Sequence, residues 1–308
     1  MPERPAPRPY RTLVAIDALW SALPMPVRTH AVPVQVGPVA ALEMYRSVLG
    51  RPLMKVFAFR VGRTLVDTGL TGASRAVVDW ARAGGAAHAI LTHHHEDHAG
   101  NAHALAEAGV SVRATSATRR LLQRPLPLPF YEHLAWGKPP AASPDLLPTR
   151  VEIDGEWAEV IPAPGHCVDQ VCLWMPSRGW CFSGDVFLSE RVRLFRRDED
   201  FAATVSSLRQ LASLPIESLF CAHRPRVAGG QAALRAKLDH LLELEAQVRH
   251  FHALGHPPAV IVRDLRLPRG STFERLSLGD ASAENLVRSV LFGPRVRAEV
   301  QAALSAGG

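Results

Sequence analysis

The pattern of apolar and polar positions changes its period several times along the chain. Residues 74–83 place apolar side chains at helical spacing before a Gly-Gly pair, which predicts a helix. Strand-like alternation on both sides of a turn predicts two hairpins, one over 151–161 and one over 171–182. An acidic start and a proline stop predict another helix over 200–214. Hairpins mixed with helices indicate a layered α/β fold.

The pattern beyond residue 230 is helical. Leucines at helical spacing predict one long helix over 231–254. Three shorter helices are expected after it, over 257–265, up to residue 291 and over 295–304. Such a helical region would wall one side of a cleft or form a contact in a homodimer.

The segment 119–150 shows neither the helical spacing nor the strand-like alternation of apolar residues. It is rich in proline and aromatic residues, and long irregular segments within compact domains are often lids or binding loops. The side chains expected to line a substrate pocket there are Phe130, Tyr131, His133 and Trp136. Phe187, outside this segment, is a similar candidate. The alternative is a surface loop held in place by its aromatic residues.

Composition favours a globular protein without a membrane span. Apolar residues make up 47% of the 308, yet no run reaches the roughly 18 apolar residues that suggest a transmembrane helix. No small-residue cleavage site follows the apolar stretch near the N-terminus, so we expect a cytoplasmic protein. The four cysteines form no C-x-x-C pair and predict neither a disulfide framework nor a zinc ribbon.

Net charge narrows the choice of partners only slightly. A formal charge of +6 favours an anionic small-molecule substrate. The arginines are scattered and no aromatic RNA-binding motif lies among them, so nucleic acid is not the expected partner.

The strongest chemical signal is the run His93-His94-His95-Glu96-Asp97-His98, which follows a strand-like segment and precedes a helix-like one. The pattern His-x-His-x-Asp-His indicates metal binding, because imidazole and carboxylate groups are common metal ligands. His93 and His95 can share one ion, while Asp97 and His98 point toward a second. His94 and Glu96 alternate away from these ligands and are expected at the loop surface. The alternative is a charged, histidine-rich surface loop.

Three more candidate ligands lie downstream, each at the end of an apolar, strand-like run. They are His166, Asp185 and His223. Upstream, Asp67 ends another such run and is expected to hold the ligand loop by hydrogen bonds. A single histidine after a strand is most often structural, but the ordered set is difficult to explain in that way.

This ordered set resembles the metallo-β-lactamase-fold superfamily of hydrolases, and in particular its glyoxalase II-like group. The resemblance rests on Asp67-Thr68-Gly69, the run 93–98, Pro-Gly-His ending at His166, Ser-Gly-Asp ending at Asp185, and His223. It implies an αββα sandwich, here with a helical C-terminal appendage. We therefore expect three parts, namely a disordered tail at 1–11, a catalytic domain at 12–230 and a helical subdomain at 231–308.

The resemblance also implies a role for each matching residue. His93, His95 and His166 would hold one ion, Asp97, His98 and His223 would hold another, and Asp185 would bridge the two. Ligation by nitrogen and oxygen suits zinc, with iron or manganese as alternatives. Asp97 would also act in catalysis, by orienting the attacking water and carrying a proton.

These roles imply a dinuclear zinc hydrolase in which a metal-bridging hydroxide cleaves a thioester or carboxylic ester. Two alternatives stay open. A phosphodiesterase or nuclease of the same fold is favoured by the basic charge. A mononuclear-iron oxidoreductase is disfavoured because the second ligand set, Asp97, His98 and His223, is complete.

Overall fold

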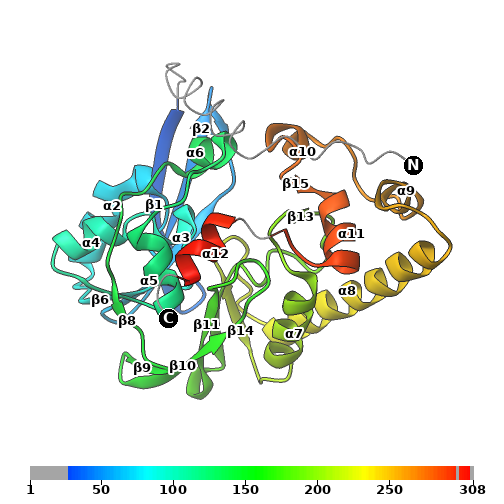
Figure 1. The fold of residues 1–308 in the computed structure, drawn as a ribbon. Helices are drawn as coiled ribbons and strands as arrows, with labels where there is room; N and C mark the ends of the chain where they lie inside the picture. The colour runs from blue at the N-terminus through cyan, green and yellow to red at the C-terminus, as the bar shows by residue number, and fades with distance from the viewer. Residues whose placement is uncertain (1–26, 296–297, 306–308) are drawn as a thin grey trace.

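The computed structural model describes residues 27–295 and 298–305, so the tail predicted at 1–11 lies outside the described residues. Two β-sheets pack face to face, and helices cover the outer face of each (Figure 1). This four-layer arrangement confirms the αββα sandwich expected from the sequence.

The first sheet comes from the N-terminal half of the chain. Its strands are β1 (Val27–Val36), β2 (Val39–Val48), β3 (Arg51–Pro52), β4 (Val56–Val61), β5 (Thr64–Val66), β6 (His88–Ile90), β7 (Ser111–Ala114) and β8 (Asp145–Leu146). They run in the order β1-β2-β4-β5-β6-β7-β8, with β3 paired to β2. The strands from β5 to β8 are parallel, so their carboxyl ends meet at one edge. Asp67 and the run 93–98 follow β5 and β6 at that edge.

The second sheet supplies the other predicted ligands. Its strands are β9 (Arg150–Ile153), β10 (Glu156–Pro162), β11 (Val171–Met175), β12 (Trp180–Gly184) and β14 (Ser218–Cys221), in the order β14-β12-β11-β10-β9. The strands β9 to β12 form the two predicted hairpins, the second turning through the 3-10 helix η2 (Pro176–Arg178). The strand β14 runs parallel to β12, after the helix α7 (Phe201–Ala212).

Successive side chains along a strand point to opposite faces of the sheet, so one set packs against the outer helices and the other packs between the two sheets. In β6, Ala89 packs toward the outer helices, whereas Ile90 packs between the sheets. In the second sheet, Phe182 and Phe220 point inward and meet Phe59 of the first sheet, with ring centroids 5.7 and 5.5 Å from that of Phe59. The period of two in the sequence therefore sets which side chains join the two sheets.

The helices against the first sheet lie between its strands in the chain. They are η1 (Thr71–Ala73), α2 (Ser74–Ala83), α3 (Glu96–Ala99), α4 (Ala102–Glu107), α5 (Ser116–Gln123) and α6 (Phe130–Trp136). The bounds of α2 match the prediction. The segment 119–150 was expected to be irregular, and this was wrong in part, because α6 and the end of α5 lie within it. The side chain of Thr115 caps α5 by accepting a hydrogen bond from Thr118 N at 3.2 Å.

The remaining helices pack mainly on the second sheet. They are α7, α8 (Gly230–Ala253), α9 (Pro258–Asp264), α10 (Thr272–Leu276), α11 (Ala283–Phe292) and α12 (Ala298–Ser305), and β13 (Phe195–Arg196) pairs with β15 (Ala281–Ser282) beside them. Leu208 of α7 and Leu234 of α8 share one core, so the division expected at residue 230 falls between helices that are packed together. The helix α12 leaves this group and packs on α5 (Figure 1). None of the helices in the described ranges has the length and apolarity needed to cross a membrane.

Candidate metal centre

The predicted ligands meet where the carboxyl ends of strands from both sheets come together. The run 93–98 leaves β6 and enters α3. His166 follows β10, Asp185 follows β12 and His223 follows β14. Four segments that are separate in sequence thus deliver side chains to one place, and the structure brings all seven predicted ligands together there.

The first group consists of His93, His95 and His166. The Nδ1 atom of His95 lies 3.0 Å from Nε2 of His93 and 3.0 Å from Nε2 of His166. Three imidazole nitrogens pointing at one another make an arrangement that can hold a metal ion.

The second group consists of Asp97, His98, Asp185 and His223. The Nε2 atom of His223 lies 3.2 Å from Oδ2 of Asp97, and the Nε2 atom of His98 lies 3.3 Å from Oδ1 of Asp185. Oδ2 of Asp185 also lies 3.5 Å from Nε2 of His166 in the first group. Asp185 therefore faces both groups, as a bridging carboxylate would.

The donor atoms fit a metal better than they fit one another. His98 Nε2 and Asp185 Oδ1 are buried and make no hydrogen bond among the described residues. Buried polar atoms without partners are costly, and metal coordination is one way to satisfy them. The donor set contains only imidazole nitrogens and carboxylate oxygens, which matches the ligation common for zinc.

At the first group, protonation also favours metal binding. Burial lowers the pKa of His93 and of His95 well below the ordinary value of 6.5, which keeps both imidazoles neutral and able to coordinate. Burial works against the charged form of Asp185, but His223 and His98 outweigh it and hold the pKa of Asp185 well below its usual range. The carboxylate that faces both groups is therefore ionised.

Hydrogen bonds from behind fix several ligands. Asp67 fulfils its predicted position, because Oδ1 accepts a hydrogen bond from Thr92 N at 2.8 Å and Oδ2 lies 2.7 Å from Nδ1 of His98. Two similar hydrogen-bonding contacts to ligand imidazoles were not predicted from the sequence. Glu199 Oε1 lies 2.8 Å from Nδ1 of His166, and the carbonyl oxygen of Lys55 lies 2.5 Å from Nδ1 of His223. Each contact leaves the other ring nitrogen facing the centre.

Close packing explains the glycine before His166. Gly165 has φ +144°, and a Cβ atom there would lie 2.7 Å from the backbone nitrogen of Thr204 in α7. The loop can approach α7 only because the side chain is missing.

The predicted substrate contacts are not gathered at the centre. Trp136 is beside it, with its ring centroid 5.9 Å from that of His223. The Tyr131 hydroxyl donates to Asp280 at 2.8 Å, and Arg46 binds the carbonyl oxygen of His133. Phe130 is half-buried at the start of α6.

The placement of Phe187 speaks against a substrate contact. It is fully buried in the core shared with α7 and α8. Its apolar neighbours account for its burial, so in the described structure it serves packing.

The expectation that His94 and Glu96 lie at the loop surface was wrong. Glu96 is buried, and burial together with nearby Glu132 raises its pKa to about 7. His94 is nearly buried, with Nδ1 2.8 Å from Oδ1 of Asp169. Both side chains are covered on this side of the ligand run by residues of α5 and α6 and by Asp169.

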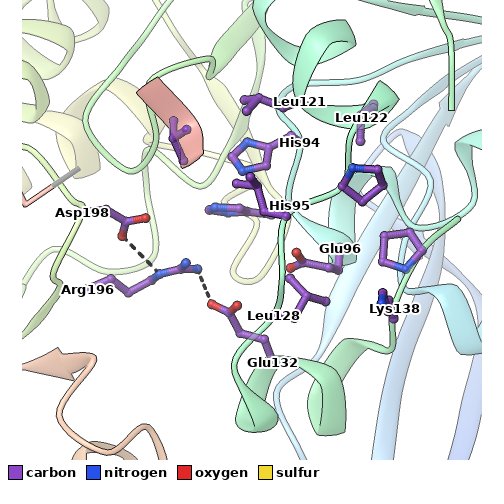
Figure 2. A pocket seen from close by; sticks show the side chains of 14 residues that line it. His94, His95, Glu96, Leu121, Leu122, Leu128, Glu132, Lys138, Arg196 and Asp198 are labelled. Carbon is purple, nitrogen blue, oxygen red and sulfur yellow. Dashed lines mark ion pairs between the residues drawn. The ribbon is translucent and has the colours of Figure 1, made fainter. Parts of the chain in front are cut away.

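A small pocket adjoins the ligand run. Figure 2 shows His94, His95 and Glu96 along one side of it, with Arg196 across from them. Arg196 pairs with Glu132 at 2.8 Å and with Asp198 at 3.5 Å. The remaining wall comes from α5, α12 and the segments on both sides of α6, and it is mostly apolar apart from Lys138.

The family model of the metallo-beta-lactamase superfamily matches residues 60–223. A hydroxyacylglutathione hydrolase from Rhodobacter capsulatus is 34% identical over 150 residues, which cover 48% of this chain and 52% of that protein. The chain thus spans about half the length of the curated relatives that it matches.

Solved structures agree on the fold. A metallo-beta-lactamase from Pontibacter korlensis aligns with a TM-score of 0.55 at 20% identity, covering 69% of this chain and 99% of that one. A metallo-beta-lactamase family protein from Thermus thermophilus aligns with a TM-score of 0.54 at 21% identity, covering 84% of this chain and 91% of that one. Because the family model spans more than half of the chain and every ligand segment, this protein belongs to the metallo-beta-lactamase superfamily.

Proposed function

We propose that this protein is a hydrolase that binds two zinc ions and cleaves a thioester or another carboxylic ester. The observation that carries the proposal is the meeting of two donor groups at one carboxylate, Asp185. Curated relatives named hydroxyacylglutathione hydrolases support a thioester as the first choice of substrate.

The metal ligands and the residues behind them would have separate roles in the reaction. When bound, zinc lowers the pKa of a water molecule from about 15.7 toward about 7 and so supplies hydroxide at neutral pH. Asp97 would accept a hydrogen bond from that water, orient it and take up its proton. Asp67, Glu199 and the Lys55 carbonyl would keep the imidazole rings oriented.

The net charge of +6 gives a second candidate, a phosphodiesterase, some support, because anionic substrates would be attracted. Arg196 and Arg226, however, already form ion pairs with carboxylates. A thioester carries no charge at the reacting group and needs no unpaired arginine to bind it. We therefore place the phosphodiester second.

The test is turnover by the zinc-loaded protein on an acyl thioester and on a phosphodiester, side by side. Asp97→Ala should lower thioester turnover by about 100-fold or more, the contribution typical of a general base. Asp79→Ala, which removes an exposed carboxylate on α2, should leave it unchanged. Phosphodiester cleavage without thioester cleavage would reverse the assignment, and full activity of Asp97→Ala would remove its role.

We also propose a cytoplasmic location and a small-molecule substrate. All four cysteines are free and buried, which suits a reducing compartment. Assembly as a homodimer stays a prediction.

A further inference from the structure

A second pocket lies between the two sheets, away from the candidate metal centre. Its volume is about 440 Å³, and it includes Thr64 and His88, which are the first residues of β5 and β6. The ligand run 93–98 leaves the opposite end of β6. None of the seven candidate metal ligands lines this pocket. Whatever occupies it is therefore separate from the reaction at the metal centre.

Two basic side chains point into the pocket from the inner face of the first sheet. In β7, Val112 and Ala114 pack toward the outer helices, so Arg113 between them points toward the second sheet. In β6, His88 shares a face with Ile90, which packs between the sheets. The other side chains in that inner layer form an apolar core. An imidazole and a guanidinium thus occupy positions where apolar packing is the rule.

Neither basic side chain has a partner within the described residues. Nδ1 of His88 is buried and makes no hydrogen bond there. The Arg113 side chain forms no ion pair or hydrogen bond in the same part of the chain, and its nitrogens are not among the sealed polar atoms. Buried polar groups are normally hydrogen-bonded, so an unpartnered imidazole nitrogen beside an unpaired guanidinium indicates a place for a ligand.

Arg63 and Thr64 add further hydrogen-bond donors to the same pocket. Nε of Arg63 donates to the carbonyl oxygen of Gly85 at 3.1 Å, which holds the side chain and leaves its outer nitrogens for a ligand. The pocket thus collects two guanidinium groups, an imidazole and a hydroxyl. Guanidinium groups match the geometry of phosphate and carboxylate oxygens.

The two acidic residues of the pocket are engaged or directed elsewhere. Asp154 pairs with Arg178 at 3.2 Å. Glu152 is exposed in β9, and its neighbours Val151 and Ile153 pack between the sheets, so alternation directs Glu152 to the opposite face. The charge of Arg113 therefore has no acidic partner in the pocket.

We propose that this pocket binds the phosphate group of a small phosphorylated molecule, with Arg113 and His88 as the main contacts. Four donor side chains exceed what the two oxygens of a carboxylate need, and they suit the several oxygens of a phosphate group. The volume of the pocket lies in the range of small-molecule sites, about 300–1,000 Å³, and leaves room for the rest of a phosphate ester. The inference does not depend on the proposed hydrolysis.

The test follows nuclear magnetic resonance signals of the zinc-loaded protein while inorganic phosphate is added. Because phosphate can also bind zinc, the readout must be local to the pocket. The ¹⁵N signals of the His88 ring and of Arg113 Nε should shift and saturate at millimolar phosphate. In Arg113→Met, the His88 shift should require roughly tenfold more phosphate or above, the effect of one lost charge-assisted hydrogen bond. Arg75→Met, a change at an exposed arginine of α2, is the control and should not alter the titration.

A second variant covers the same site from the other contact. His88→Phe keeps a ring of similar size but removes the ring nitrogens, and it should weaken the phosphate-dependent shift of Arg113 Nε to a similar extent. This variant decides the question if Arg113→Met does not fold.

Two results would overturn the proposal. One is a shift of the ligand histidines without a shift of His88 or Arg113, which would place phosphate at the metal centre alone. The other is an unchanged titration in Arg113→Met and His88→Phe. A wild type that cleaved no thioester would refute the proposed function but would leave this test of the pocket intact.

Discussion

At the scale of single residues, the centre depends on carboxylates that touch more than one imidazole. Asp185 faces His98 and His223 on one side and His166 on the other. Asp67 plays a similar part from behind, since it joins the backbone of Thr92 to the ring of His98. Removing Asp185 would therefore disturb several ligands together, whereas removing Asp67 would release the His98 ring and the backbone at Thr92.

Asp67→Ala tests this at the position that does not bind metal itself. Loss of the hydrogen bond should free the His98 ring and weaken zinc binding at the second group by about 10- to 100-fold. Calorimetric titration with zinc measures the change, and Asp79→Ala on the surface of α2 serves as the control. Unaltered affinity in Asp67→Ala would show that the ring is held by packing alone.

The sequence was most informative where one residue type repeats in a short motif. The meeting of the run 93–98 with His166, Asp185 and His223, and the place of Asp67 behind it, could be predicted, because each segment follows a strand-like run. Glu199 and Asp169 could not, since no local pattern links them to His166 and His94, from which they lie 33 and 75 residues away. His94 was misplaced for the same reason, as alternation along a loop does not show which tertiary partners cover it.

At the scale of elements, α6 joins the two sides of the molecule next to the centre. Glu132 of α6 pairs with Arg196 of β13 at 2.8 Å, and the adjacent Tyr131 hydroxyl donates to Asp280 just before β15. Both partners of the ion pair are nearly buried. These contacts hold α6 against the C-terminal part of the chain.

Glu132→Ala should therefore be strongly destabilising. It leaves the buried Arg196 guanidinium without its partner at 2.8 Å, and loss of one partner of a buried pair costs about 3–5 kcal/mol. Urea unfolding measures the change. Glu107→Ala, at an exposed site of α4, should stay within about 0.5 kcal/mol of the wild type. Similar losses in both variants would contradict the importance of the pair.

Helix prediction succeeded where caps, an opening proline or long apolar faces were recognised, as for α8 and α9, and failed for α6 and α10. The helix α8 was expected within one residue of its observed bounds. The helix α10 was missed, although Ser271 and Glu274 form a local start signal in which Ser271 Oγ accepts from Glu274 N at 3.1 Å. The helix α6 was not predicted, because the proline-rich stretch before it indicated irregular structure, although a proline can also stand directly before a helix.

At the scale of the whole molecule, three cores correspond to the three interfaces of a four-layer sandwich. The core on the second sheet includes side chains of α7, α8 and α11. The C-terminal helices therefore contribute to the same apolar interior that supports Asp185 and His223.

Leu241→Ala tests whether α8 stabilises this interior. Leu241 is fully buried, so its truncation should cost about 2–5 kcal/mol of unfolding free energy. The loss should appear in one cooperative transition, seen alike by circular dichroism and tryptophan fluorescence. Leu254→Ala, at an exposed position after α8, is the matched control. Two separate transitions would contradict a shared core.

The most direct test of the central claim is a zinc titration of the metal-free protein, followed by metal analysis and thioester turnover at each step. Two donor groups joined by Asp185 predict that binding ends at two zinc ions per chain, and that turnover reaches its maximum only when the second is bound. Saturation at one ion, or full turnover without zinc, would contradict the account.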